Sequence, residues 1–196
     1  MLALVVVAHP CSDSLTHGLA ARAEAGLRAA GYEVALVDLY AIGFRAAMSE
    51  EERSAYHSDQ PILDPVIAEH AHLLSTASIV VFAYPTWWSG LPAILKGWIE
   101  RVIVPGVGFT FDERTGKVKP GLDNITHLIG ISTYGSPRTA VRLINDNGRR
   151  TIARALRMSC GLRARTRWRG LYSVDTSSAS ERQEFAASVE RTLALL

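Results

Sequence analysis

Residues 78–98 read SIVVFAYPTWWSGLPAILKGW, and the rest of the chain is arranged around this stretch. Ser78–Ala83 forms a β-branched and aromatic block that is typical of a buried strand. Apolar residues then recur at helical spacing from Leu91 to about Val104, which predicts a helix. Between the two, Trp87 and Trp88 are costly to leave in water, so we expect them to wall a pocket for a flat cofactor.

The same alternation of apolar strand and amphipathic helix runs through the chain. Further strands are predicted at Leu2–Ala8, Glu33–Leu39, Thr126–Ser132 and Ala164–Tyr172. Further helices are predicted at Leu15–Ala30, Asp64–Ser75, Arg138–Met158 and around Phe185–Leu196, with a short exposed helix at Ser49–Arg53 and a small hairpin around Phe109–Val118. Five strands alternating with five helices imply an α/β three-layer sandwich whose five-stranded parallel sheet has the doubly wound order 2-1-3-4-5.

Composition indicates an ordinary globular protein. The 196 residues are 48% hydrophobic and 20% charged, and no repeat, linker or boundary divides them, so we expect one domain over residues 1–196. No apolar run approaches the ~18 residues that span a bilayer, and the run that begins at Leu2 is too short for a signal peptide. Two cysteines form no disulfide framework, which favours a reducing, cytoplasmic location.

Positive charge is concentrated in one segment. Arg138–Arg169 holds ten arginines and a single acid, Asp146, although the net charge of the whole chain is only +2. A solvated helix face and a surface for an anionic partner, such as a nucleotide phosphate or an acidic protein, both fit this pattern. Nucleic acid is the less favoured partner, because no recognisable nucleic-acid motif accompanies the arginines.

Three loops are expected to meet at one edge of the sheet. In the order 2-1-3-4-5 the switch point lies between the first and third strands, and ligands bind beyond the carboxyl ends of the strands there. The loops at that edge are His9–Ser14, Tyr84–Gly90 and Thr133–Pro137, which are rich in hydroxyl groups, aromatic rings, glycine and proline. Fold and residue chemistry therefore predict one site.

The loop after the first strand is suited to phosphate. Ser12, Ser14 and Thr16 provide hydroxyl groups, and the start of the following helix, at Leu15, provides free N–H groups and the positive end of the helix dipole. His9 adds a further donor. A capped helix with incidental serines explains the same residues, and neither a Gly-x-Gly-x-x-Gly motif nor a Walker loop follows the strand.

The other two loops are suited to a flat ring. We expect Trp87 and Trp88 to form an apolar wall and the backbone of Ser89 and Gly90 to donate hydrogen bonds to its polar edge. The alternative, that one tryptophan packs in the core or at a subunit contact, is expected to hold for one of the two. Thr133-Tyr134-Gly135 would close the site from the far side, unless it is a plain turn.

Other chemistries are not supported. His70 and His72 diverge on a helix, so no metal site is expected, and no Gly-x-Ser-x-Gly elbow for a hydrolase is present. Cys11 is a lone cysteine, and such residues are mostly inert.

The segments Ala8-His9-Pro10, Asp38-Leu39-Tyr40, Pro85–Trp98 and Val104-Pro105-Gly106 together resemble the NAD(P)H quinone oxidoreductases of flavodoxin-like fold. The resemblance implies a homodimer with one flavin per subunit and ping-pong hydride transfer from NAD(P)H to a quinone. By position, it implies flavin-phosphate contacts at His9, Ser14 and Thr16. It likewise implies a ring-binding loop of Pro85, Thr86, Trp87, Trp88 and Ser89, with Thr133 and Tyr134 as the second wall.

The chain departs from that family in three places. Ala140 and Asp146 stand where mammalian members carry a tyrosine and a histidine that stabilise charge on the reduced ring, so we expect Tyr134 to substitute as the catalytic residue. Ser89 stands where the family commonly has an aromatic residue. The long C-terminal extension of the mammalian enzymes is absent, which leaves both FAD and FMN open. Both NADH and NADPH are open as well, and the arginine cluster is compatible with a 2′-phosphate contact.

The favoured function is a cytoplasmic flavin-dependent NAD(P)H oxidoreductase with a quinone or similar small acceptor. The alternatives are an azo, nitro or flavin reductase, an ancillary flavoprotein subunit docked on a membrane-bound potassium efflux system, and a one-electron carrier. The carrier is disfavoured, because such proteins are usually acidic and this chain has a net charge of +2.

Overall fold

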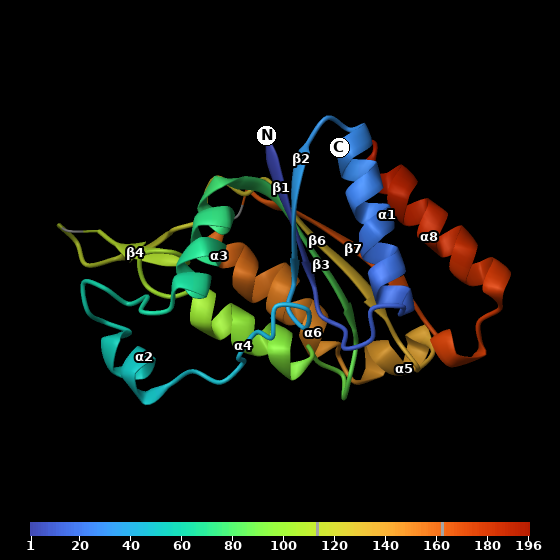
Figure 1. The fold of residues 1–196 in the computed structure, drawn as a ribbon, viewed down its shortest axis with the longest axis horizontal. Helices are drawn as coiled ribbons and strands as arrows, with labels where there is room; N and C mark the ends of the chain where they lie inside the picture. The colour runs from blue at the N-terminus through green and yellow to red at the C-terminus, as the bar shows by residue number, and fades with distance from the viewer. Residues whose placement is uncertain (113, 162) are drawn as a thin grey trace.

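A five-stranded parallel sheet forms the centre of the computed structural model, which describes residues 1–112, 114–161 and 163–196 (Figure 1). Its strands lie in the order β2-β1-β3-β6-β7. Their bounds are Leu2–Val7 for β1, Glu33–Asp38 for β2, Ala77–Pro85 for β3, His127–Thr133 for β6 and Arg165–Leu171 for β7. The predicted α/β class with a five-stranded parallel sheet is confirmed. The labels β4 and β5 belong to a separate hairpin, Phe109–Phe111 and Val118–Pro120, so the five sheet strands counted alone have the order 2-1-3-4-5.

Helices cover both faces of the sheet (Figure 1). On one face, α1 (Leu15–Ala29) and α8 (Ala179–Leu193) pack side by side and share a core with β1 and β3. On the other face, α3 (Pro65–Thr76) and α4 (Ala93–Val102) cover the same strands. Because both faces are buried, the central strands are continuous apolar runs and not alternating ones.

The third sheet strand is longer than predicted. It extends past Ala83 through Tyr84 and Pro85, and Pro85 lies opposite Thr133 in the β3–β6 ladder. Tyr84 is fully buried. The predicted loop Tyr84–Gly90 therefore begins only at Thr86.

The single helix predicted at Arg138–Met158 is wrong. The segment folds as α5 (Arg138–Leu143), α6 (Asn147–Arg150), the π-helix η1 (Thr151–Leu156) and α7 (Arg157–Ser159). The break lies at Asn145 and Asp146, whose φ angles are +71° and +27°. Asparagine and aspartate tolerate this left-handed region better than most residues, and the Asp146 side chain then accepts the backbone N–H of Arg149 at 3.1 Å as a new helix cap.

The short helix α2 (Glu50–Ala55) is fixed to the body of the protein by a buried charge network. Arg101 of α4 is 3% exposed and donates to Glu52 of α2 and, at 2.9 Å, to Asp64, the N-cap residue of α3. Glu52 also completes a capping box with Ser49. The helix predicted here exists, but its Glu52 is buried and not exposed.

Candidate functional site

The three predicted loops do meet at one edge of the sheet, beyond the carboxyl ends of β1, β3 and β6. These strands are neighbours in the parallel sheet, with Val7 opposite Ala83 and Pro85 opposite Thr133. The loop amide of Thr86 donates to Thr133 O at 2.8 Å, and the Thr86 and Ser132 hydroxyl oxygens lie 2.8 Å apart. The backbone of the second loop is thus held against the end of β6.

In the first loop, the side chain of Ser14 serves as a helix cap. Its Oγ accepts the His17 N–H at 3.3 Å and lies 2.9 Å from His17 Nδ1, while His17 Nε2 lies 2.8 Å from Asp38 Oδ2. The geometry supports the capping explanation for Ser14. Thr16 is buried at 4% exposure, and His9 accepts the Cys11 N–H at 3.0 Å through Nδ1. The anion-binding capacity of this loop therefore comes mainly from the start of the 15-residue helix α1.

The second loop forms a tight turn with a left-handed centre. Trp87 and Gly90 exchange backbone hydrogen bonds of 3.3 and 3.0 Å, and Trp88 and Ser89 between them have φ angles of +46° and +60°. Positive φ at both central positions is the pattern of a type I′ turn, which usually carries glycine or asparagine. A bulky residue in this region costs ~1–3 kcal/mol, and such strain is concentrated at functional sites.

The turn sends the two tryptophan rings in different directions. Trp88 is fully exposed at 102%, whereas Trp87 is 42% exposed and its ring centroid lies 6.1 Å from that of His9. Neither indole is buried inside this chain, so neither tryptophan packs in its core, and the other half of that alternative, a subunit contact for one of them, stays a prediction.

A cavity of about 330 Å³ lies beside the turn, and we call it the Trp88 cavity. It brings together five of the predicted site residues, namely Thr86, Trp88, Ser89, Tyr134 and Gly135. Ser136, Val141, Ile144 and Asp146 complete its lining. The other predicted residues do not line it; they are His9, Ser14, Leu15, Thr16, Pro85, Trp87 and Thr133.

Tyr134 faces a carboxylate at the base of the cavity. Its hydroxyl donates to Asp146 Oδ2 at 2.8 Å and accepts the Trp168 Nε1–H at 2.9 Å. Burial, and then the negative charge of Asp146, raise the pKa of Tyr134 well above its usual value, so the phenol stays protonated at neutral pH. Sequence reasoning placed Asp146 where a family histidine stands but missed its contact with Tyr134, and it missed Trp168 altogether.

Tyr84 provides a second phenol close to this carboxylate. Burial, followed by the neighbouring Tyr134 and Asp146, raises the pKa of Tyr84 well above its usual value. Its hydroxyl has no hydrogen-bond partner among the described residues. A side chain at Gly148 would meet this oxygen at 3.0 Å, and the neighbouring Asn147 N–H donates to Ser89 O at 3.0 Å. The start of α6 thus packs closely against the strained turn and supports it.

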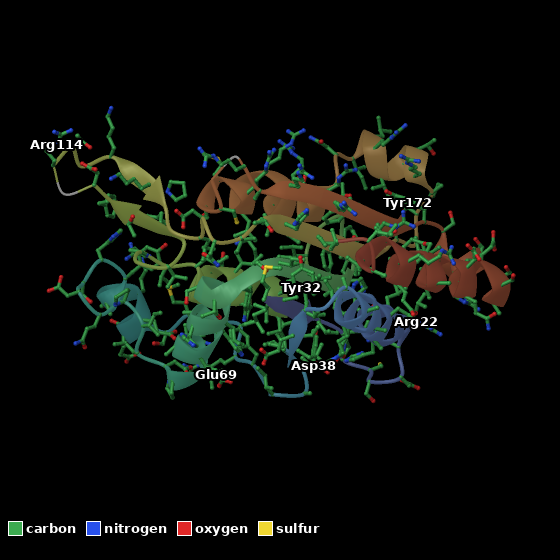
Figure 2. The ribbon with its side chains drawn as sticks, turned by 90° about the horizontal axis from the view of Figure 1, so that it is seen from above. Arg22, Tyr32, Asp38, Glu69, Arg114 and Tyr172 are labelled. Carbon is green, nitrogen blue, oxygen red and sulfur yellow. The ribbon has the colours of Figure 1, made fainter. Side chains whose placement is uncertain are left out.

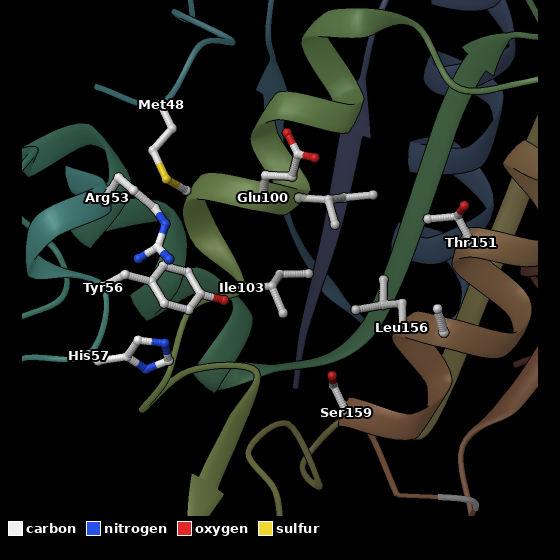
Figure 3. Close-up of a pocket in the computed structure, with 11 residues that line it drawn as sticks. Met48, Arg53, Tyr56, His57, Glu100, Ile103, Thr151, Leu156 and Ser159 are labelled. Atoms are coloured by element: carbon white, nitrogen blue, oxygen red, sulfur yellow. The ribbon is translucent and has the colours of Figure 1, made fainter. Parts of the chain in front are cut away.

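Another cavity, of about 540 Å³, lies elsewhere, between α2, α4 and η1 (Figure 3). Figure 3 shows side chains of three elements pointing into it, among them Arg53, Tyr56, His57, Ile103 and Leu156. None of the predicted site residues lines it. In the part of the chain that the structure describes, no group of three or more His, Cys, Asp or Glu side chains is placed to hold a metal ion, and no helix is both long and apolar enough to cross a bilayer.

Known proteins resemble this chain in sequence and in fold. NAD(P)H dehydrogenase (quinone) 1 of Rattus norvegicus is 34% identical over 149 residues, which cover 68% of this chain and 54% of the relative. The NAD(P)H:quinone oxidoreductase of Methanothermobacter marburgensis superposes with a TM-score of 0.81 at 23% identity, over 99% of this chain and 98% of that one. An FMN-dependent NADH-azoreductase from Bacillus anthracis, solved in complex with FMN, gives a TM-score of 0.73 at 14% identity, over 99% and 98% of the two chains.

These likenesses differ in what they establish. At such low identity, the two solved structures show the fold alone. This chain spans about half the length of the curated relatives that it matches. The model of the family described as "Flavodoxin-like fold" matches residues 1–195, and the chain therefore belongs to the Flavodoxin_2 family.

Proposed function

We propose that this chain is an NAD(P)H oxidoreductase that uses a bound flavin to reduce a quinone or a similar acceptor by ping-pong hydride transfer. The observation that carries the proposal is the Trp88 cavity, where residues of the β3–α4 loop and of the loop after β6 line one space beyond the carboxyl ends of these two neighbouring strands. The similarity to the Rattus norvegicus enzyme supports the same reaction class.

The residues at this site fit a flavin. In the described part of the chain, the backbone N–H groups of Trp88 and Ser89 make no hydrogen bond, so the turn offers two donors to the polar edge of a ring. The exposed Trp88 indole offers an apolar face beside them. The start of α1, with His9 and Ser14 nearby, offers N–H groups for a phosphate. We infer contacts from Leu15, Thr16, Pro85, Thr86, Trp87, Thr133 and Gly135 in the same site.

The chain's own residues bind, orient and protect the reacting groups. A flavin held by these residues would supply the hydride-transfer chemistry between NAD(P)H and the acceptor. Tyr134 is our candidate catalytic residue: its Oη holds a proton that it shares with Asp146, beside the cavity. Trp168 fixes the orientation of that phenol.

The proposal also covers the domain organisation, the location and the oligomeric state of the protein. We propose that residues 1–196 act as one flavin-binding domain, in the cytoplasm, and as a homodimer. Exposed apolar side chains near the cavity support the dimer, since Trp88, Leu143 (87% exposed) and Ile144 (49% exposed) would otherwise remain in water. The identity of the acceptor is determined by turnover assays, and the choice between FAD and FMN by mass spectrometry of the released cofactor.

Mass spectrometry of the released cofactor, combined with anaerobic mixing of the yellow protein with NADH or NADPH, tests the function. We expect one flavin per chain, bleaching of its visible absorbance, and recovery of that absorbance on adding a benzoquinone. A protein that releases no flavin, or whose flavin neither nucleotide bleaches, would contradict the proposal. Tyr134→Phe should lower the rate of flavin reduction while the amount of bound flavin stays the same; an unchanged rate removes the catalytic role of Tyr134.

A further inference from the structure

Six arginines surround a second concave space next to the Trp88 cavity. Its volume is about 470 Å³, and we call it the arginine groove, after Arg138, Arg142, Arg149, Arg150, Arg154 and Arg157. Thr166 and Tyr172 line it from β7 and the residue that follows this strand. In Figure 2, nitrogen-tipped side chains project from the orange part of the ribbon, on the side of the molecule where Tyr172 is labelled.

Most of the arginines in the groove form no ion pair with a carboxylate of the described residues, and the same holds for some arginines elsewhere, such as Arg167 and Arg182. Arg22, Arg28, Arg101 and Arg191 each pair with a carboxylate. Among the described residues, Arg138, Arg142, Arg149, Arg150 and Arg154 form no such ion pair. The one carboxylate in the lining, that of Asp146, is already bonded to the Tyr134 hydroxyl and the Arg149 N–H. Like charges one helical turn apart, as in Arg138 and Arg142, repel each other, and a bound anion relieves that repulsion.

Parts of the groove are held in place before any ligand arrives. The guanidinium carbon of Arg149 lies 5.7 Å from the centroid of the Trp168 ring, and Arg157 Nε donates to Ala164 O at 2.7 Å. The Tyr172 ring stacks on Tyr134 with centroids 4.6 Å apart. Fixed guanidinium forks bind phosphate oxygens in pairs, which makes arginine the preferred residue for phosphate recognition.

The shape of the groove favours a small molecule over a macromolecule. A volume of about 470 Å³ lies within the range of small-molecule sites, ~300–1,000 Å³. Val141 and Asp146 line both this groove and the Trp88 cavity, so the two spaces adjoin. A ligand in the groove therefore lies beside the site that we assign to hydride transfer.

We propose that the arginine groove binds a small molecule through two or more phosphate groups, as a nucleotide would supply. Two ligands carry such phosphates. The first is the nicotinamide co-substrate, through its phosphate-bearing end, and this assignment rests on the proposed function. The second is a separate nucleotide that binds beside the co-substrate. Phosphate binding in the groove itself does not depend on the flavin reaction.

The first experiment measures pyrophosphate binding to the full chain by titration calorimetry at constant ionic strength. The variant Arg150→Gln/Arg154→Gln removes two exposed cations of the groove, and Arg114→Gln/Arg165→Gln removes two exposed cations outside it, with the same change in net charge. We expect saturable binding that the groove variant weakens by roughly tenfold or more, since the variant removes charge-assisted hydrogen bonds to the phosphate oxygens. The control should remain within about twofold, because salt screens distant charges.

Non-saturable binding to the unmodified chain, or equal weakening in both variants, would overturn the proposal. Arg142→Gln alone serves as a second groove variant if the double variant is less stable in thermal unfolding. The source of the phosphates then follows from KM: a rise for both NADH and NADPH in the groove variant identifies the pyrophosphate of the co-substrate, and a larger rise for NADPH adds its 2′-phosphate. Weakened pyrophosphate binding with unchanged KM values identifies a separate nucleotide. Pyrophosphate binding can be measured even if the protein does not turn over NAD(P)H. Failure of the proposed function is therefore distinguishable from failure of the phosphate-binding proposal.

Discussion

Trp98 and Trp88 lie ten positions apart in the same stretch of sequence but in opposite environments. Trp98 is fully buried on α4, where its Nε1–H donates to His70 Nδ1 at 3.1 Å and its ring lies 6.0 Å from that of Phe82. Trp88 is fully exposed on a turn with a φ angle of +46°. The difference is that the Trp98 ring is part of the core, whereas the Trp88 ring lies exposed on a strained turn that lines the Trp88 cavity.

The largest expected change in stability comes from removing the buried ring of Trp98. Trp98→Ala should lower the free energy of unfolding by ~3–5 kcal/mol, because it leaves a cavity and removes the partner of His70. Urea denaturation measures this change. Trp88→Ala is the matched control and should change the cofactor-free protein by less than ~0.5 kcal/mol. Similar losses for the two variants would contradict the distinction between them.

The exposed ring should matter for the cofactor instead. Trp88→Ala should lower the flavin retained per chain by about tenfold, since an aromatic contact contributes up to ~1.5 kcal/mol. Absorbance of the purified protein, scaled to protein concentration, gives the occupancy, and Trp88→Phe should keep most of it. Unchanged absorbance in Trp88→Ala would remove Trp88 from the site.

The stability that the region around Trp98 contributes should also depend on pH. Burial lowers the pKa of His70, so the folded protein holds it neutral while the unfolded chain takes up a proton below ~6.5. The stabilisation is complete above pH ~6.5 and is lost as the pH falls toward the lowered value, by up to ~1.4 kcal/mol per pH unit. Urea denaturation at pH 7.5 and 5.5 measures the loss. His70→Gln keeps an acceptor for Trp98 and should show a smaller loss, even though the pKa of His127 is also lowered by burial; an equal loss would assign the effect to other groups.

The smallest change in stability is expected from relieving the backbone strain of the turn at Trp88 and Ser89. Ser89→Gly relieves the strain of a φ angle of +60°, which the flexibility of glycine in the unfolded chain partly offsets, so the gain should stay below ~1 kcal/mol. Thermal unfolding measures it, and flavin occupancy should be unchanged because the donors are backbone N–H groups. A loss of stability would mean that the Ser89 hydroxyl contributes to the turn.

Much of the fold could be predicted from local patterns. The five sheet strands, the cap at Ser14 and the helix start at Pro65 depend on spacing and residue type within a few positions, and the structure has them all. The prediction of one helix across Asn145–Asp146 was wrong because the spacing of apolar residues continues without interruption there. The break is visible only in the structure, as a left-handed backbone followed by a new helix cap. The turn signal of Asn145-Asp146-Asn147-Gly148 could have located it.

The sequence by itself determined the alternation of strands and helices, the parallel sheet that follows from it, and the three loops that meet beyond its strands. These features depend on periodicity, which neighbouring residues carry. Only the tertiary structure decided that Trp88 is exposed, that Tyr134 donates to Asp146 and accepts from Trp168, and that six arginines gather around one groove. Such contacts join residues from separate elements, and their partners are selected by packing and hydrogen-bond satisfaction across the whole chain.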